Sequence, residues 1–259
     1  MLLEVKDLNI SLTSEKSVAE HISFRLGQGE MLSIVGSSGA GKTTICKAIM
    51  GLLGNTYRAD GEILFQGEDL LDLPERKRQT IYGKEICLIM QNPMTAFNPS
   101  IRVGRQMEKT YLLHHGKTPR QEMQRLFAAI LQKLGLEDTQ RILNSYPFTL
   151  SGGMLQRLMI AAALMCQPAL LVADEATTAI DACNRIGLMR ELKSFCKDGM
   201  SVLFVTHDLR SASVSARLLV MDRGQIVEQG KTEQILNTPK EDYTKYLLNA
   251  CRLERREMS

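Results

Sequence analysis

Short hydrophobic runs alternate with longer amphipathic stretches along this chain. Four of the runs are apolar at almost every position, as expected of strands that are buried on both faces of a parallel sheet. They are Met31–Val35, Ile86–Met90, Leu170–Ala173 and Val202–Val205. Between the last two runs, apolar positions in residues 178–197 recur close to helical spacing. This alternation of strand and helix predicts an α/β fold built on a parallel sheet.

Three other segments have the pattern of antiparallel strands. Residues 3–10 form one of them, and residues 218–228 form a hairpin whose turn is Asp222–Gly224. Residues 61–67 are a short strand bounded by glycines. We expect these segments to form a small β layer beside the parallel sheet.

Residues 92–165 differ from the rest because they contain few strand patterns and one clear helix. Thr118, followed by Pro119 and by Gln121 three places on, has the form of a capping box, and Gly135 is placed to end the helix. The apolar stripe between these ends predicts core packing. It consists of Met123, Leu126, Phe127, Ile130, Leu131 and Leu134. The segment is therefore predicted to be a mostly helical insert between two strands.

Composition and charge exclude several classes of protein. The 259 residues are 44% hydrophobic and carry a net charge of +3, so the chain can bury a core without disulfides and has no basic block for nucleic acid. The six cysteines form no C-x-x-C pair, which argues against zinc, iron–sulfur and redox-pair sites and favours reduced packing residues. No signal peptide is recognisable, and the longest apolar run, 158–166, is too short to span a bilayer. We expect a cytoplasmic chain.

The segment after the first buried strand has the pattern G-x-x-x-x-G-K-[ST] and leads into a predicted helix. Backbone N–H groups of such a loop, together with the helix N-terminus, point at phosphate oxygens. The lysine supplies a positive charge to the β- and γ-phosphates, and the hydroxyl of Thr43 is available to Mg²⁺. The expected phosphate-binding residues are Gly36, Ser37, Ser38, Gly39, Ala40, Gly41, Lys42, Thr43 and Thr44.

Two carboxylates end the buried strand at 170–173. Asp174 is predicted to associate with the Mg²⁺ beside the phosphate loop. Glu175 follows directly, where a carboxylate can orient and deprotonate an attacking water. These two residues predict nucleotide hydrolysis.

The string Leu150–Arg157, between the two nucleotide motifs, resembles the signature of ATP-binding-cassette ATPases. Ser151, Gly152 and Gly153 at a helix N-terminus would form a second anion site. The resemblance implies that this site closes on the γ-phosphate of ATP held by an opposite subunit. It also implies an α/β P-loop NTPase fold, with a RecA-like parallel sheet core, an N-terminal antiparallel β layer and a helical insert.

Three further residues match that family. Gln91 is similar to its glutamine that reaches the metal and the water, Asp181 lies in a loop like the one that signals between subunits, and His207 resembles its switch histidine at the γ-phosphate. Leu12 stands where the family often stacks an aromatic residue on adenine. The implied organisation is a nucleotide-binding core in residues 1–91 and 166–230, a helical insert in 92–165 and a C-terminal tail in 231–259.

Residues 91–99 resemble the glutamine loop of importer ATPases for peptides and nickel. Peptide-type relatives often have a longer tail with clustered cysteines, whereas Cys251 stands alone here, so nickel is the expected cargo and peptides are the alternative. The resemblance implies two transmembrane permease subunits, a second and related ATPase chain, and indirectly an extracytoplasmic solute-binding protein. It places the chain at the cytoplasmic face of the inner membrane, as a peripheral subunit.

Other hypotheses are weaker on the sequence. His114 and His115 could suggest nickel ligands, but adjacent helical residues point in different directions, and solvated surface is the preferred interpretation. A DNA-repair cassette would show sustained heptads between Lys42 and Ser151, and a translation-factor cassette would repeat the motif set. The chain has neither feature.

Overall fold

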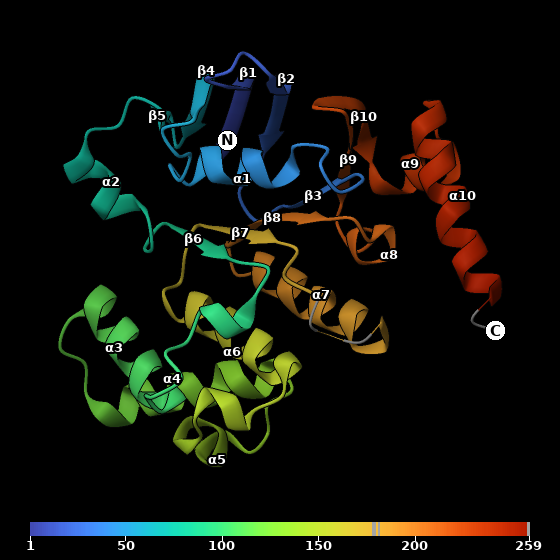
Figure 1. Cartoon of the computed structure of the whole chain (residues 1–259). Coiled ribbons are helices and arrows are strands. Elements are labelled where there is room, and N and C mark those ends of the chain that lie inside the picture. Colours follow the sequence, from blue (N-terminus) through green and yellow to red (C-terminus); the bar gives the residue numbers. More distant parts are fainter. Residues whose placement is uncertain (178–179, 181, 258–259) are drawn as a thin grey trace.

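A computed structural model describes residues 1–177, 180 and 182–257 of the chain and contains two sheets with a helix between them (Figure 1). The first sheet is antiparallel, as predicted. Its strands lie in the order β2 (Ser17–Leu26), β1 (Leu3–Leu12), β4 (Tyr57–Phe65) and β5 (Glu68–Asp69).

The second sheet contains the four predicted buried strands. Its order is β10 (Gln225–Lys231), β9 (Arg217–Asp222), β3 (Met31–Val35), β8 (Ser201–Thr206), β7 (Leu170–Asp174) and β6 (Ile86–Ile89). All neighbours in it are parallel except β9 and β10. The α/β prediction is thereby confirmed.

The hairpin prediction needs one correction. The β9–β10 hairpin exists, but it extends the parallel sheet instead of joining the small β layer. The reason is that β9 is buried on both faces from Leu218 to Met221 and pairs in parallel with β3. A strand of this kind is stabilised inside a covered sheet rather than at a solvated β layer.

Ten α-helices cover the sheets in the described part of the chain. They are α1 (Lys42–Ile49), α2 (Glu75–Ile81), α3 (Val103–His115), α4 (Arg120–Lys133), α5 (Thr139–Asn144), α6 (Gly152–Met165), α7 (Ala182–Cys196), α8 (Leu209–Ala212), α9 (Thr232–Asn237) and α10 (Asp242–Glu257). Figure 1 shows α1 between the sheets, α3 to α6 grouped below the parallel sheet, and α10 at its side. The region 92–165 is helical, as its sequence predicted.

The predicted capping box at Thr118 is wrong. Helix α4 begins at Arg120 after Pro119, and no side chain caps it. The Thr118 hydroxyl is instead directed at the Gly116 carbonyl oxygen, 3.5 Å away. Proline fixes the backbone at the entry to the helix, and the first bonds of the helix run from the Glu122 (3.0 Å) and Met123 (3.2 Å) N–H groups to the Pro119 carbonyl oxygen. The predicted stop is close to correct, since Gly135 has a φ of +69° after the helix ends.

Two hydrophobic clusters meet on opposite faces of the parallel sheet. One joins the antiparallel sheet and α1 to one face, through residues such as Ile10, Ile45 and Leu203. The other joins helices α3 to α7 to the opposite face, through residues such as Phe127 and Phe204. The stripe of α4 belongs to this second cluster, which confirms its predicted role in packing.

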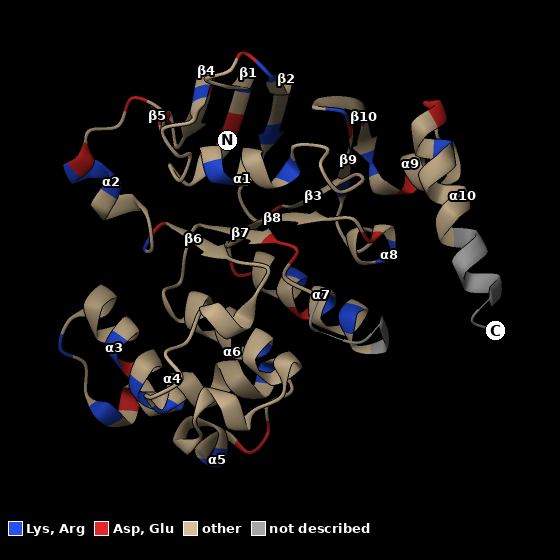
Figure 2. Cartoon of the chain, viewed as in Figure 1, with Lys and Arg blue, Asp and Glu red and all other residues tan. Residues whose placement is uncertain are grey.

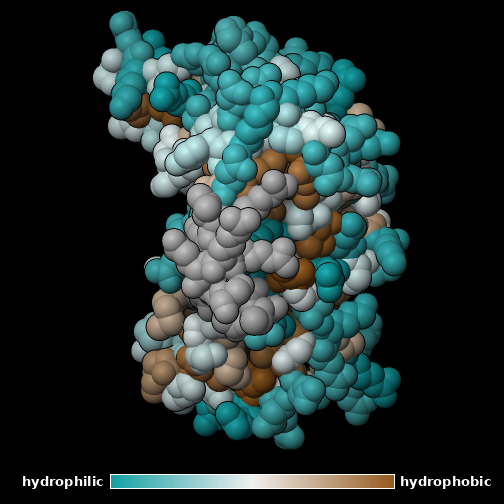
Figure 3. All heavy atoms as spheres, turned by 90° about the vertical axis from the view of Figure 1, so that its right-hand side faces the viewer, coloured by the Kyte–Doolittle hydropathy of each residue, from teal (hydrophilic) through white to brown (hydrophobic). Residues whose placement is uncertain are grey.

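Surface charge and hydrophobicity are mixed. Lys, Arg, Asp and Glu are interspersed over the helices (Figure 2). On the side that carries α10, hydrophobic residues show mainly in the middle and lower parts, and the top is hydrophilic (Figure 3). In the described residues, no helix is both long and apolar enough to be a candidate bilayer span.

Candidate active site

The predicted phosphate loop connects β3 to α1 and closes around the side chain of Lys42. The Lys42 Nζ donates hydrogen bonds to the carbonyl oxygens of Gly36 (2.9 Å) and Ser37 (2.8 Å). Burial lowers the pKa of this amine, against the opposing charges of Glu175 and Asp174. The loop therefore holds a desolvated cation at the N-terminus of α1, an arrangement suited to a phosphate group.

Two positions of the loop have no room for a side chain, which explains the glycines there. A Cβ on Gly36 would lie 2.2 Å from the carbonyl oxygen of Met221. Gly41 has a φ of +96°, and a Cβ there would lie 2.7 Å from the carbonyl oxygen of Val18. Any larger residue at either position would push the loop away from the strands beside it.

Thr43 and Asp174 come from neighbouring parts of the fold and meet beside the loop. The Thr43 hydroxyl donates to Asp174 Oδ1 at 3.2 Å. Burial raises the pKa of Asp174, and the bond from Thr43 opposes that shift. A hydroxyl and a carboxylate are the oxygen ligands that Mg²⁺ accepts, so this pair fits the predicted cation site.

Glu175 lies at the centre of a three-residue contact. Its Oε2 accepts a hydrogen bond of 2.6 Å from Gln91 Nε2, and its Oε1 lies 3.0 Å from His207 Nδ1. The histidine side chain is 54% exposed and the glutamate side chain 16%, so the carboxylate is the inner member of the pair. Residues from three strand ends thus converge on one carboxylate.

The backbone of Glu175 is strained. Its φ is +48°, a conformation that is unusual for a residue with a side chain. The Glu175 N–H donates to the Val205 carbonyl oxygen at 2.8 Å, which ties the turn to β8. Strained residues of this kind persist where the surrounding structure fixes them, and they concentrate at functional sites.

The predicted signature residues lie apart from this group. Ser151 is the N-cap of α6, and its Oγ accepts from the Met154 N–H at 3.3 Å. Gly152 and Gly153 form the first turn. Ser151 and Gly152 are exposed to solvent. Among the described residues, the structure joins Lys42, Thr43, Asp174, Glu175, Gln91 and His207 in one region but gives Ser151 only contacts within its own helix end. Asp181 lies outside the described residues.

Sequence reasoning missed an ion pair beside the site. Arg185 Nη1 lies 3.3 Å from Asp208 Oδ2, and its Nε and Nη2 donate to the Ile180 carbonyl oxygen. Burial tends to raise the pKa of Asp208, but hydrogen bonds from Ser211 and the Arg210 backbone outweigh it, so the net shift is downward. The pair links the loop after Glu175 to the loop after His207. The sequence offered one signal for it: Asp208 stands directly before a short helix, where aspartate is a common N-cap.

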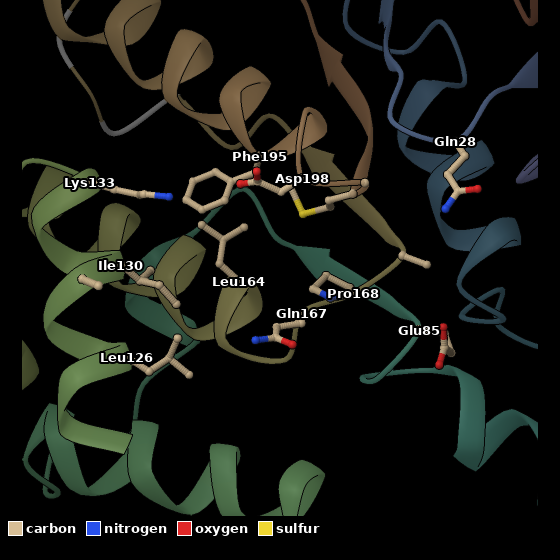
Figure 4. A pocket seen from close by; sticks show the side chains of 14 residues that line it. Gln28, Glu85, Leu126, Ile130, Lys133, Leu164, Gln167, Pro168, Phe195 and Asp198 are labelled. Carbon is tan, nitrogen blue, oxygen red and sulfur yellow. The ribbon is translucent and has the colours of Figure 1, made fainter. Parts of the chain in front are cut away.

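A cavity of about 600 Å³ lies elsewhere, at the amino ends of the parallel strands (Figure 4). Leu126, Ile130 and Phe195 form its apolar wall, and Lys133 Nζ lies 5.0 Å from the centre of the Phe195 ring. Its described lining does not include a residue predicted to bind nucleotide. The predicted chemistry is thus at the opposite, carboxyl edge of the sheet.

The two adjacent histidines do not form a metal centre. His115 stacks on Tyr111 with 4.3 Å between ring centres, and its Nε2 lies 3.0 Å from the Met165 carbonyl oxygen. His114 is half-buried, so the prediction of a solvated surface is wrong for this residue. Across the described residues, no group of three or more His, Cys, Asp or Glu side chains is placed to hold a metal ion.

Comparisons with known proteins agree with this geometry. The family model described as "ABC transporter" matches residues 19–178. A metal-staphylopine import ATP-binding protein, CntD of Staphylococcus aureus, is 40% identical over 96% of this chain and 92% of its own length. The oligopeptide transport ATP-binding protein OppD of Bacillus subtilis is 41% identical, over 95% of this chain and 71% of its own.

A solved structure supports the same assignment. It is the ATP-binding cassette MJ0796 in a post-hydrolysis state with ADP and Pi, which matches with a TM-score of 0.78 and 26% identity over 89% of this chain and 99% of its own. The fold, the motifs and these relatives agree. This chain belongs to the ABC transporter family and is an ATP-hydrolysing subunit of an ABC importer.

Proposed function

We propose that the six side chains at the carboxyl edge of the sheet bind MgATP and activate water. Lys42 and the amides of the loop take the β- and γ-phosphates, while Thr43, Asp174 and Gln91 surround Mg²⁺. Glu175 is the general base. The observation that carries this proposal is the convergence of Gln91 and His207 on the Glu175 carboxylate.

Each partner of Glu175 has a separate task in this proposal. The Gln91 side chain orients one oxygen of the Glu175 carboxylate and would reach the cation. His207 lies beside the other oxygen of the carboxylate and would contact the γ-phosphate. Both hold the carboxylate in place to accept the proton of the attacking water. The φ of +48° at Glu175 supports a functional role for this residue, since strained residues concentrate at functional sites.

The catalytic unit is proposed to contain two chains. Ser151, Gly152 and Gly153 present a helix N-terminus to solvent, where it can bind the γ-phosphate held by a second cassette. Asp181 is assigned to communication between the cassettes. The relative MJ0796 has been solved as a dimer. We propose that the second chain is a related but distinct ATPase.

Assembly is tested by the ATPase rate of the isolated chain against its concentration. We expect a mainly monomeric chain with slow hydrolysis, and a rate per chain that rises with concentration as ATP favours pairing. The permeases and the partner cassette should raise turnover several-fold by holding the halves together, through effective concentration. Fast hydrolysis that does not depend on concentration, in a species shown to be monomeric by light scattering, would contradict the two-chain proposal.

The proposed place of work is the cytoplasmic face of the inner membrane, on two permease subunits. Several hydrophobic residues in and near the Gln91 loop and in the helical region are exposed: Met90, Met94, Ile101, Tyr146 and Phe148. The rings of Tyr146 and Phe148 stack, with 5.6 Å between their centres. Exposed hydrophobic side chains of this kind are suited to contact with a protein partner. An extracytoplasmic solute-binding protein would deliver the cargo to the permeases.

Nickel is the proposed cargo, and di- or oligopeptides are the alternative. The loop at 91–99 resembles importers of both classes, and the relatives are named for metal-staphylopine and for oligopeptide import. Uptake of radioactive nickel and of a labelled dipeptide should be compared in cells that lack this gene. Nickel uptake should fall and return with the wild-type gene but not with Lys42→Ala. A loss confined to dipeptide uptake would favour the alternative.

The chain itself should bind no nickel, because the permease and the binding protein contact the cargo and no metal-ligand cluster exists among the described residues. Calorimetry with Ni²⁺ tests this expectation. A stoichiometric site tighter than micromolar that disappears when His114 and His115 are replaced would show that this chain also senses the metal.

A further inference from the structure

The C-terminal helix reaches the phosphate loop. The Ser37 N–H donates a hydrogen bond of 3.0 Å to the hydroxyl of Tyr243, the second residue of α10, across 206 positions of the sequence. Ser37 also offers its carbonyl oxygen to Lys42 Nζ at 2.8 Å. The same residue therefore connects the lysine of the loop to the tyrosine of the C-terminal helix.

Helix α10 is fixed where it approaches the loop. The two carboxylate oxygens of Glu228, in β10, accept hydrogen bonds from the backbone N–H groups of Lys240 (3.0 Å) and Glu241 (3.2 Å). Further along the helix, Arg210 Nη2 donates to the Cys251 carbonyl oxygen at 3.3 Å. These bonds attach the helix to the edge of the sheet at its start and to α8 near its other end.

Apolar packing follows the same route. A third hydrophobic cluster brings together Val35, Leu209 and Leu248, with Tyr243 packed against it. Val35 directly precedes Gly36 of the phosphate loop, and Leu209 follows His207 by two positions. Helix α10 thus packs against the residues that support both sides of the proposed ATP site.

We propose that Tyr243 is a positioning residue for ATP binding. Its hydroxyl holds the Gly36–Ser37 peptide unit in the orientation in which the Gly36 carbonyl oxygen accepts from Lys42 Nζ at 2.9 Å, so the C-terminal helix sets the shape of the loop's first turn. This rests on the proposed role of the loop in holding the nucleotide phosphates. Because Ser37 is exposed, water can replace the hydroxyl, and the effect of losing it is on order in the loop.

The first test is Tyr243→Phe, which removes only the hydroxyl. The Kd for MgATP, measured by calorimetry, should rise about threefold, the effect of a single net hydrogen bond. KM should rise in parallel while kcat stays within about twofold, because Glu175 and its partners are untouched. The melting temperature should stay the same, since the ring and its packing remain.

Tyr246→Phe is the matched control. Tyr246 is on the same helix, its ring lies 6.4 Å from that of Tyr243, and it is 67% exposed. It should leave the Kd unchanged. An unchanged Kd in Tyr243→Phe, or a lowered melting temperature with normal ATP affinity, would overturn the proposal in favour of simple packing.

A double-mutant cycle separates this contact from other effects of the ring. Ser37→Pro removes the N–H that Tyr243 accepts, so Tyr243→Phe should have no further effect on the Kd in that background. An equal loss in both backgrounds would show that Tyr243 acts elsewhere.

Lys42→Ala is the reference variant that tests the phosphate role of the loop itself. If it kept full ATP affinity, the proposed phosphate role would be wrong, whatever Tyr243 did.

Discussion

The edge of the parallel sheet and the start of α6 are both proposed to bind an anion, and their residues are arranged in different ways. At the sheet edge the predicted side chains bond to one another, as Thr43 does to Asp174 and Gln91 to Glu175. At the start of α6, Ser151 is exposed, and within the described part of the chain its hydrogen bonds stay at its own helix end. One chain brings the residues of the first site together. The second site is proposed to need a partner chain.

The difference follows from geometry. The carboxyl ends of parallel strands lie side by side, so residues as distant in sequence as Lys42 and His207 are brought to one edge. A helix N-terminus needs no other element, because its free N–H groups and dipole are local. Substitutions in the first site should therefore affect the isolated chain, and substitutions in the second should affect only the assembly.

The largest expected effect is that of Glu175→Gln on hydrolysis. Removing the base should slow single-turnover hydrolysis by about 100-fold or more, while ATP binding stays normal. Glu191→Gln, a partly buried carboxylate of α7, is the control and should hydrolyse ATP normally. Hydrolysis by Glu175→Gln within a few-fold of wild type would mean that the base is another group.

Lys42→Ala should act on binding instead. It removes a buried cation from the centre of the phosphate loop, so calorimetry should show ATP affinity reduced by about tenfold or more. Lys47→Ala, at the other end of α1, should bind as wild type does. Equal ATP affinity in Lys42→Ala and wild type would refute the phosphate role.

Ser151→Arg tests the helix end. The arginine should block the composite site without touching the phosphate loop, so ATP binding by the isolated chain should be nearly unchanged. The several-fold stimulation by permeases and partner cassette should be lost, as measured by ATPase assays in proteoliposomes. Weakened ATP binding by the isolated variant would show that the two sites are not independent.

The smallest expected effect is on stability. Burial raises the pKa of Asp174 in the folded chain. Above that pKa the ionised carboxylate therefore lowers the free energy of unfolding. Asp174→Asn should therefore raise the melting temperature without Mg²⁺, by about one degree, at pH 8. The gain should shrink as the pH falls through the raised pKa of folded Asp174 and disappear well below pH 4, where the carboxyl is protonated in both states. A gain that grew on acidification would contradict this sign.

Several features followed directly from the sequence. The strands at Met31–Val35 and Leu170–Ala173 were recognisable because parallel strands are apolar on both faces. The phosphate loop was recognisable because its glycines, lysine and threonine act at fixed local spacing. The helix start was less predictable. Thr118 has the form of a cap, but α4 begins after Pro119 without a side-chain cap.

The contacts between distant segments could not be predicted. Nothing in the sequence around Arg185 or Tyr243 indicates that one pairs with Asp208 and the other with the Ser37 amide. Such pairs depend on where packing places whole elements, here α7 against α8 and α10 against the edge of the sheet. Their energies are small compared with the burial of the core that brings them together.

The sequence by itself determined which chemical groups this protein has and which of them stand at strand ends and helix starts, because those patterns are local. The tertiary structure decided that the β9–β10 hairpin extends the parallel sheet. It also decided that Glu175 receives both Gln91 and His207. The physical reason is that hydrophobic burial is non-directional: it selects an arrangement of the elements as a whole, and the positions of polar side chains follow from that arrangement.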